Sequence, residues 1–207
     1  HRVDDQIDQP PRRVAQGRGA QHRQDEIRAV GHTPAAERLA EILAPALQPH
    51  LGGRVEHAAS RGAFDQAMME KIDAYQPDLV VLAGFMRILT PEFCAHYENR
   101  LINIHPSILP SFTGLHTHER ALEAGCRVAG CTIHFVTPEL DCGPIISQGI
   151  VPILDGDTAD DVAARVLTVE HQLFPQAVAD FVAGRLKIEG NRVLNAQRNA
   201  AGQSLLA

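Results

Sequence analysis

The fold is decided by the stretch "DLVVLAGF", residues 78–85, and by "RLINIH", residues 100–105, which follows it along the chain. The first is a continuous apolar run of strand length, typical of a parallel strand that is covered on both faces. Between the two runs, Thr90, Pro91 and Glu92 supply an N-cap, a proline for the first turn and an acidic residue for a short helix. A strand, a helix and a second strand in this order predict an α/β protein.

The same alternation continues outward in both directions. Apolar residues at helical spacing (Phe64, Met68, Ile72 and Tyr75) predict a helix before the first strand. Thr158 and Asp161 resemble a capping box and predict a long helix that bends at Pro175 and ends at Gly184. Further segments predict a helix at 118–125, strands at 130–136 and 143–153, and a hairpin at 186–194 that turns at Gly190. We therefore expect an open, mostly parallel, Rossmann-like sheet, which binds ligands outside the carboxyl ends of its strands.

Composition divides the chain into three parts. Residues 1–60 contain no Phe, Tyr or Trp and are dense in Arg, Gln, His, Pro and Ala. Their one periodic segment is a helical pattern at 34–47, and the rest is typical of disorder. We assign residues 1–60 as an atypical segment, residues 61–195 as the catalytic domain and residues 196–207 as a polar tail.

Charge and cysteine content exclude several classes of function. The net charge of −6 offers no basic face for nucleic acid, and no apolar run is long enough to span a membrane. No apolar core of a signal peptide is visible in the first thirty residues. The four cysteines show no CxxC spacing and no metal framework, so we expect reduced thiols in a cytoplasmic protein.

Asn103 and His105 are the first candidates for chemistry. They lie two residues apart at the end of a predicted strand, so their side chains should point to one side of the sheet. A carboxamide can donate to a developing oxyanion, and an imidazole can move a proton near neutral pH. The alternative is structural: Asn103 would cap the strand end, and His105 would be hydrogen-bonded in a turn.

Other polar residues allow a structural interpretation as well. Asp141 in "ELDCGP" is typical of a turn, although an Asp that faces a His can orient it or raise its pKa. His134 shares a strand face with Thr132 and is more typical of a hydrogen-bonded core histidine. His116 and His118 have the spacing of ligands on a strand but no third ligand is evident, so we expect no metal site.

Together these segments resemble the glycinamide ribonucleotide formyltransferases, within the wider formyltransferase superfamily. The resemblance rests on "PDLVVLAGFMRIL" (77–89), "NIHPSILPSFTGLHTHERAL" (103–122), "GCTIHFV" (130–136), "ELDCGPIISQ" (139–148) and "EHQLFPQAV" (170–178). It runs from about Phe64 to about Leu194. It implies transfer of a formyl group from 10-formyltetrahydrofolate, a co-substrate, to the amine of glycinamide ribonucleotide, with no metal.

The resemblance also implies roles for residues. Asn103 and a protonated His105 would stabilise the oxyanion, and Asp141 would hold His105 charged and help to move the proton. Backbone from Met86 through Arg87 and Ile88 to Leu89, with Leu140 and Asp141, would cradle the pterin. Glu170 would contact the ribose hydroxyls, and Pro106 would lie against the ribonucleotide. The partners implied are small molecules, and both a monomer and a homodimer stay open.

Two departures from the resemblance concern the loop and the N-terminal part. Thr113 stands where the family usually has proline, which should loosen the loop slightly. Residues 1–60 show neither the buried opening strand nor the Gly/Ser-rich phosphate loop of the family. Because the segment keeps about the expected length, we hypothesise that residues 1 to about 61 are translated out of frame. A chain made as written would leave an unpaired apolar edge at residues 78–85, dissolve poorly and show little or no transformylase activity.

Two alternative functions stay open. A formyltetrahydrofolate deformylase would release the formyl group without the ribonucleotide amine. An inactive remnant that lacks the phosphate loop would bind folate without turnover.

Overall fold

The computed structural model describes residues 26–30 and 61–195. Its elements are β1 (Glu26–Val30), α2 (Arg61–Asp73), β2 (Leu79–Ala83), α3 (Pro91–His96), β3 (Leu101–His105), α4 (Thr117–Glu123), β4 (Val128–Phe135), β5 (Ile145–Pro152), α5 (Ala159–Val182), β6 (Leu186–Glu189) and β7 (Arg192–Asn195). The helix proposed at 34–47 and the polar tail lie outside the described residues.

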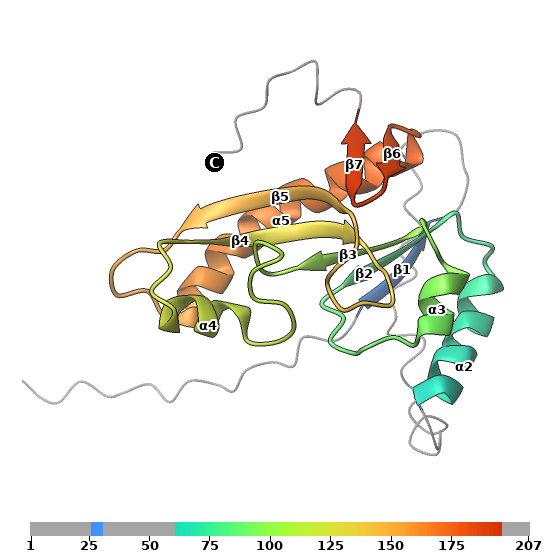
Figure 1. Cartoon of the computed structure of the whole chain (residues 1–207), viewed down its shortest axis with the longest axis horizontal. Helices are drawn as coiled ribbons and strands as arrows, with labels where there is room; N and C mark the ends of the chain where they lie inside the picture. The colour runs from blue at the N-terminus through green and yellow to red at the C-terminus, as the bar shows by residue number, and fades with distance from the viewer. Residues whose placement is uncertain (1–25, 31–60, 196–207) are drawn as a thin grey trace, which may run out of the picture.

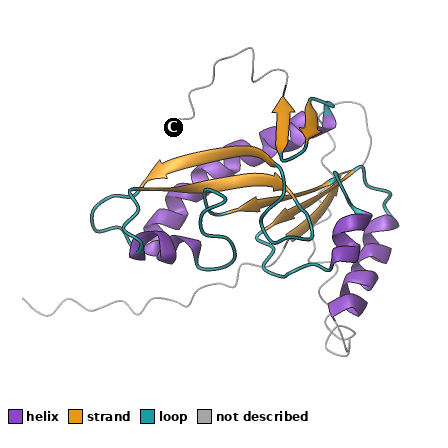
Figure 2. Ribbon diagram, in the orientation of Figure 1, coloured by secondary structure: helices purple, strands orange, loops and turns teal. Residues whose placement is uncertain are grey.

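The described strands form one sheet in the order β1-β2-β3-β4-β5-β7-β6 (Figure 1). With helices on its faces, this sheet confirms the α/β class (Figure 2). The pairing is mixed: β2–β3 and β5–β7 are parallel, and the other described ladders are antiparallel. The sequence predicted a mostly parallel sheet. Among the described strands, only these two ladders are parallel.

The apolar edge predicted at residues 78–85 is not open. β1 pairs antiparallel with β2, from Glu26 opposite Ala83 to Val30 opposite Leu79, and β3 pairs with the other side of β2. The backbone groups of β2 thus have ladder partners on both sides. The prediction of an unpaired edge is wrong, because a strand forms within the segment that composition marked as atypical.

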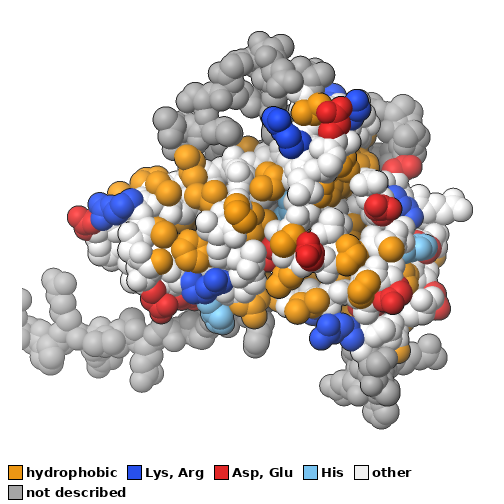
Figure 3. Space-filling view, viewed as in Figure 1, with side chains coloured by type: hydrophobic (Ala, Val, Ile, Leu, Met, Phe, Trp, Pro, Cys, Tyr) orange, Lys and Arg blue, Asp and Glu red, His pale blue; other side chains and the backbone are white. Residues whose placement is uncertain are grey.

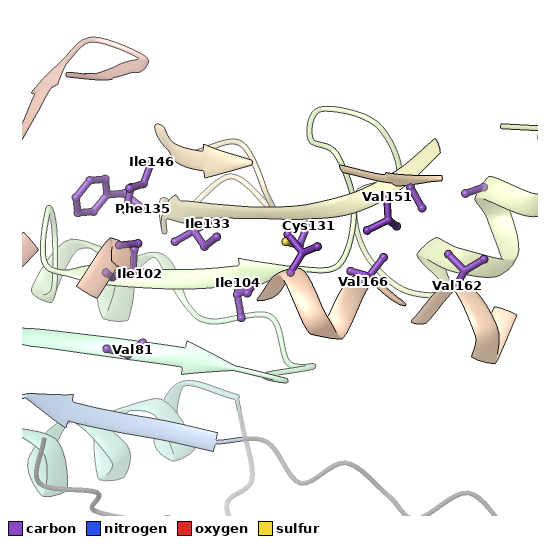
Figure 4. Packing of buried hydrophobic residues seen from close by; sticks show 14 of the residues in the cluster. Val81, Ile102, Ile104, Cys131, Ile133, Phe135, Ile146, Val151, Val162 and Val166 are labelled. Atoms are coloured by element: carbon purple, nitrogen blue, oxygen red, sulfur yellow. The ribbon is translucent and has the colours of Figure 1, made fainter. Parts of the chain in front are cut away.

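Successive side chains along the strands point to opposite faces of the sheet and build two apolar cores, one on each face. On β2, Leu79 and Val81 pack in the core beneath α5, whereas Val80 and Leu82 pack against α2 and α3. Ile133 of β4 joins the α5 core, which Figure 4 shows between the strands and that helix. The continuous apolar run of residues 79–82 is therefore explained by burial on both faces.

Helix boundaries follow the predicted signals. Thr90 caps α3, with Pro91 in its first turn, and Thr158 and Asp161 form the complete capping box of α5. α5 continues through Pro175 to Val182, so Pro175 does not end the helix. Tyr75, predicted on the buried stripe of α2, is 59% exposed, because the helix ends at Asp73.

Candidate active site

The candidate residues of β3 lie on the face of the sheet that is turned away from α5. Ile102 and Ile104 point into the α5 core, so the alternation of the strand places Asn103 and His105 on the opposite face. The carboxyl end of β3 leads directly into the loop 106–113. This confirms that the two side chains share one side of the sheet.

His105 is held between two acceptors. Its Nε2 lies 3.0 Å from the carbonyl oxygen of Phe112, which can only accept, so Nε2 carries a proton. Its Nδ1 lies 3.6 Å from Oδ2 of Asp141, and only 7% and 8% of the two side chains are exposed. At this distance Nδ1 and the carboxylate form a close ion pair rather than a direct hydrogen bond when His105 is protonated.

Asp141 lies in the connection between β4 and β5, with φ at 55°, in the left-handed region. Its Oδ2 accepts a hydrogen bond from the backbone N–H of Gly114 at 2.8 Å. Its Oδ1 lies 4.0 Å from Nε2 of His134. Asp141 is therefore more than a turn residue, because its carboxylate faces two imidazoles and is oriented by the loop.

His134 is a buried, hydrogen-bonded histidine, as the sequence interpretation expected, and the structure also places it beside Asn103. It lies opposite Asn103 in the antiparallel β3–β4 ladder, and Nδ2 of Asn103 lies 3.4 Å from its Nε2. Its Nδ1 lies 2.9 Å from the carbonyl oxygen of Phe135, which assigns the proton to Nδ1 and leaves Nε2 to accept from Asn103. The only sequence signal was the face that it shares with Thr132.

Burial sets the charge of His134. Desolvation lowers its pKa below the usual value, against the opposing effects of the Phe135 carbonyl and the Asp141 carboxylate, while His105 lowers it further. A neutral His134 fits its role as acceptor for Asn103. The Oδ1 atom of Asn103 is buried and has no hydrogen-bond partner within the described part of the chain, although buried amide oxygens are usually paired.

The loop after His105 is anchored on β4 and β5. The hydroxyl of Thr132 donates to the carbonyl of Ser107 at 2.7 Å and accepts from the N–H of Leu109 at 3.0 Å. Gln148 donates to the carbonyl of Leu109 at 2.8 Å, and the Leu109–Pro110 peptide bond is cis. These polar groups on neighbouring strands fix the start of the loop directly beside His105.

The residues predicted to hold the pterin lie in two connections. Met86 and Ile88, which follow β2, are 59% and 53% exposed, and Leu140, beside Asp141, is 49% exposed. Figure 3 shows hydrophobic side chains at several places on the face of the molecule opposite α5. Leu89 is buried in the core with α2 and α3, and the guanidinium of Arg87 lies 3.7 Å from the centroid of the Phe64 ring.

The two residues predicted to touch the ribonucleotide come from different elements, Pro106 directly after β3 and Glu170 on α5. Pro106 follows His105 directly, and its carbonyl accepts a hydrogen bond from the hydroxyl of Thr117 at 2.7 Å. Glu170 lies on α5, which packs against the face of the sheet opposite to Asn103 and His105. Together with desolvation, which is the larger cause, its charge raises the pKa of buried Cys131 to about 12. The structure thus brings Asn103, His105 and Asp141 together but places Glu170 across the sheet from them.

The arrangement can polarise and protonate a carbonyl group. It offers an amide N–H, an imidazole N–H and a buried carboxylate within one small region, which are the groups that stabilise an oxyanion and move a proton. Among residues 61–195 and β1, no group of three His, Cys, Asp or Glu side chains is arranged to hold a metal ion. No helix in the described part is both long enough and apolar enough to cross a membrane.

Comparison with known proteins finds similar transferases and, at lower coverage, a deformylase. The phosphoribosylglycinamide formyltransferase of Escherichia coli (strain K12) is 54% identical over 140 residues, which cover 67% of this chain and 66% of that protein. The crystal structure of glycinamide ribonucleotide transformylase 1 from Symbiobacterium toebii has a TM-score of 0.65 and 51% identity, covering 66% of this chain and 65% of that one. A formyltetrahydrofolate deformylase of E. coli O6:H1 is 44% identical over 135 residues, but the match covers only 48% of its length.

The chain thus spans slightly less than two thirds of the E. coli transferase and of the Symbiobacterium structure. The Formyl transferase family model matches residues 13–178, which is most of the chain and includes every residue of the Asn103, His105, His134 and Asp141 cluster. The chain therefore belongs to the formyl transferase family.

Proposed function

We propose that this chain carries the site for transfer of a formyl group from 10-formyltetrahydrofolate to the amine of glycinamide ribonucleotide, a step of purine biosynthesis. The observation that carries the proposal is the cluster at the carboxyl end of β3, where Asn103 lies beside the His105–Asp141 pair. The named relatives support the choice of substrates. The reaction needs no covalent enzyme intermediate.

In the proposed reaction the amine attacks the formyl carbon, and negative charge grows on the formyl oxygen. Nδ2 of Asn103 keeps one N–H for that oxygen while the other points to His134, and Nδ1 of His105 donates from the other side. Asp141 stabilises the charged form of His105 and relays the proton from the attacking nitrogen to the leaving nitrogen. The Oδ1 atom of Asn103, which has no partner among the residues that the structure describes, accepts an N–H of the attacking amine.

Binding groups surround this centre. The exposed apolar side chains of Met86, Ile88 and Leu140 offer a surface for the pterin, with backbone groups of Arg87, Leu89 and Asp141 beside them. Pro106 contacts the ribonucleotide next to the reacting carbon. Glu170 is assigned to the ribose hydroxyls, which the ribonucleotide reaches from the edge of the sheet at the end of β3.

The proposal also covers the cellular compartment, the binding partners and the oligomeric state. We propose a cytoplasmic enzyme that acts on small molecules and binds neither nucleic acid nor membranes, as a monomer or a homodimer. The second candidate is a deformylase, which the 44% identity to the deformylase supports. The two functions differ in whether formyl loss requires the ribonucleotide amine.

The purified 207-residue chain tests the proposal. Calorimetry with a folate analogue, and an assay of formyl loss with and without the ribonucleotide, separate the candidates. We expect folate binding and a small turnover that requires the ribonucleotide, since no phosphate loop is recognisable in residues 1–60. Formyl loss without the amine favours the deformylase, and absence of folate binding overturns the proposal.

A further inference from the structure

One short segment contacts both members of the His105–Asp141 pair. Within residues 112–115, the carbonyl of Phe112 accepts from His105, and the N–H of Gly114 donates to Asp141. The two contacts are two residues apart and come from outside the sheet. The geometry of the pair therefore depends on the conformation of this segment.

The segment does not hold that conformation by itself. Phe112 has φ at 56° and Gly114 at 76°, and the non-glycine residue bears a steric cost in the left-handed region. Packing beside the loop is also incomplete, because a cavity of about 260 Å³ lies between parts of the loop, α4 and β4. Its lining includes Pro106, Ser111 and Phe112 of the loop and Thr117 and Ala121 of the helix.

Arg120 bridges the segment to α4. Its Nη1 donates to the carbonyl of Thr113 at 2.6 Å and to the carbonyl of Leu115 at 3.3 Å, and its guanidinium lies 5.5 Å from the centroid of the Phe112 ring. The next residue, Ala121, is 4% exposed and belongs to the α5 core. Arg120 thus connects a strained segment to an element that the main core fixes.

We propose that Arg120 is a positioning residue: it holds residues 112–115 so that Phe112 and Gly114 orient His105 and Asp141. The contact falls at Thr113, where proline would have fixed φ and where threonine leaves the backbone freer. Nη1 of the guanidinium serves both carbonyls while its carbon lies near the aromatic ring, and the compact ammonium of lysine lacks the planar face for that ring contact. The catalytic consequence rests on the function proposed above, whereas the structural consequence does not.

The structural consequence is tested with Arg120→Ala, Arg120→Lys and the control Arg127→Ala. The control removes an exposed arginine whose guanidinium pairs with the exposed Asp155. Hydrogen exchange is followed at the Gly114 amide, and the His105 ring nitrogens are followed by ¹⁵N NMR. We expect Arg120→Ala to speed exchange at Gly114 about tenfold and to weaken the Nε2–H signal of His105. Arg120→Lys should fall in between, and Arg127→Ala should match the parent chain. Unchanged exchange and ring signals in Arg120→Ala overturn the proposal, even if the chain transfers no formyl group.

The kinetic consequence is a split between kcat and KM. For Arg120→Ala we expect kcat to fall about tenfold with both KM values within about twofold, since displaced catalytic groups cost rate rather than substrate affinity. A parent chain without transfer activity would count against the proposed function, and the exchange and NMR results would then decide the role of Arg120. Altered exchange together with an unchanged kcat would overturn the catalytic part of the inference.

Discussion

Nδ1 of His105 lies 3.6 Å from Oδ2 of Asp141, and both side chains are more than nine-tenths buried. At this distance the carboxylate can orient the imidazole ring and stabilise a positive charge that forms on it during a reaction. The sequence places the two residues 36 positions apart, so only the fold unites them. The first two predictions depend on this pair and on its neighbour Asn103.

Replacing Asp141 by Asn removes the charge but keeps the shape of the side chain and an oxygen for the Gly114 amide. We expect kcat to fall about a hundredfold or more, because a positive charge that forms on His105 during the reaction loses its partner. Steady-state kinetics measures the effect, and circular dichroism checks that the fold is kept. Activity within about threefold of the parent chain would assign Asp141 to the turn alone.

Replacing Asn103 by Ala removes a donor for the developing oxyanion. We expect kcat to fall by about a hundredfold to a thousandfold. The dissociation constant of a folate analogue, measured by calorimetry, should stay close to that of the parent chain. A loss confined to folate affinity, with kcat kept, would contradict the proposed role.

His134 makes stability depend on pH. Burial lowers its folded-state pKa, so the unfolded chain binds more protons between that pKa and the ordinary value near 6.5. Its contribution to the free energy of unfolding is therefore complete above about pH 6.5 and is lost as the pH falls toward the folded pKa. Urea titrations at pH 7.5 and pH 5 measure the free energy of unfolding of both proteins. We expect the difference between the two pH values to be smaller in His134→Gln than in the parent chain. An equal difference in both proteins would show that His134 does not titrate in this way.

Gly149 allows α5 to pack closely on β5. A Cβ atom there would lie 2.2 Å from Cγ1 of Val169 and 2.7 Å from Cδ1 of Leu173. We expect Gly149→Ala to lower the free energy of unfolding by about 1–3 kcal/mol, through overpacking. Adding Val169→Ala removes the nearest atom, so the double variant should be more stable than the sum of the single effects predicts. If the two effects simply add, the loss of stability in Gly149→Ala does not come from a clash with Val169.

The hypothesis that residues 1 to about 61 are translated out of frame is tested by reading the nucleotide sequence of the gene in the other two frames. We expect one of the other two reading frames to encode an apolar strand followed by a Gly/Ser-rich loop, joining the present frame near Arg61, where α2 begins. The absence of such a segment in both frames would refute it. The family match begins at residue 13, so part of this segment is already included in that match.

Local patterns predicted much of the fold and singled out Asn103, His105 and Asp141 as candidates for chemistry. Apolar runs and capping residues located the elements, because burial and backbone hydrogen bonding leave direct traces in the sequence. The importance of His134 could not be read in this way, because it depends on the register between β3 and β4. The β1–β2 ladder was missed for a similar reason, since pairing partners are chosen by the whole sheet.

The β3–β4 register links the chemistry of the site to the quality of the fold. A slip of one residue would turn Ile133 toward Asn103 and force His134 into the apolar core under α5. Such a chain would expose an isoleucine and bury an unpaired imidazole, so it would be disfavoured before any substrate arrived. Correct assembly of the candidate site is therefore coupled to stability: molecules that misplace Asn103 and His134 are also those least able to stay folded.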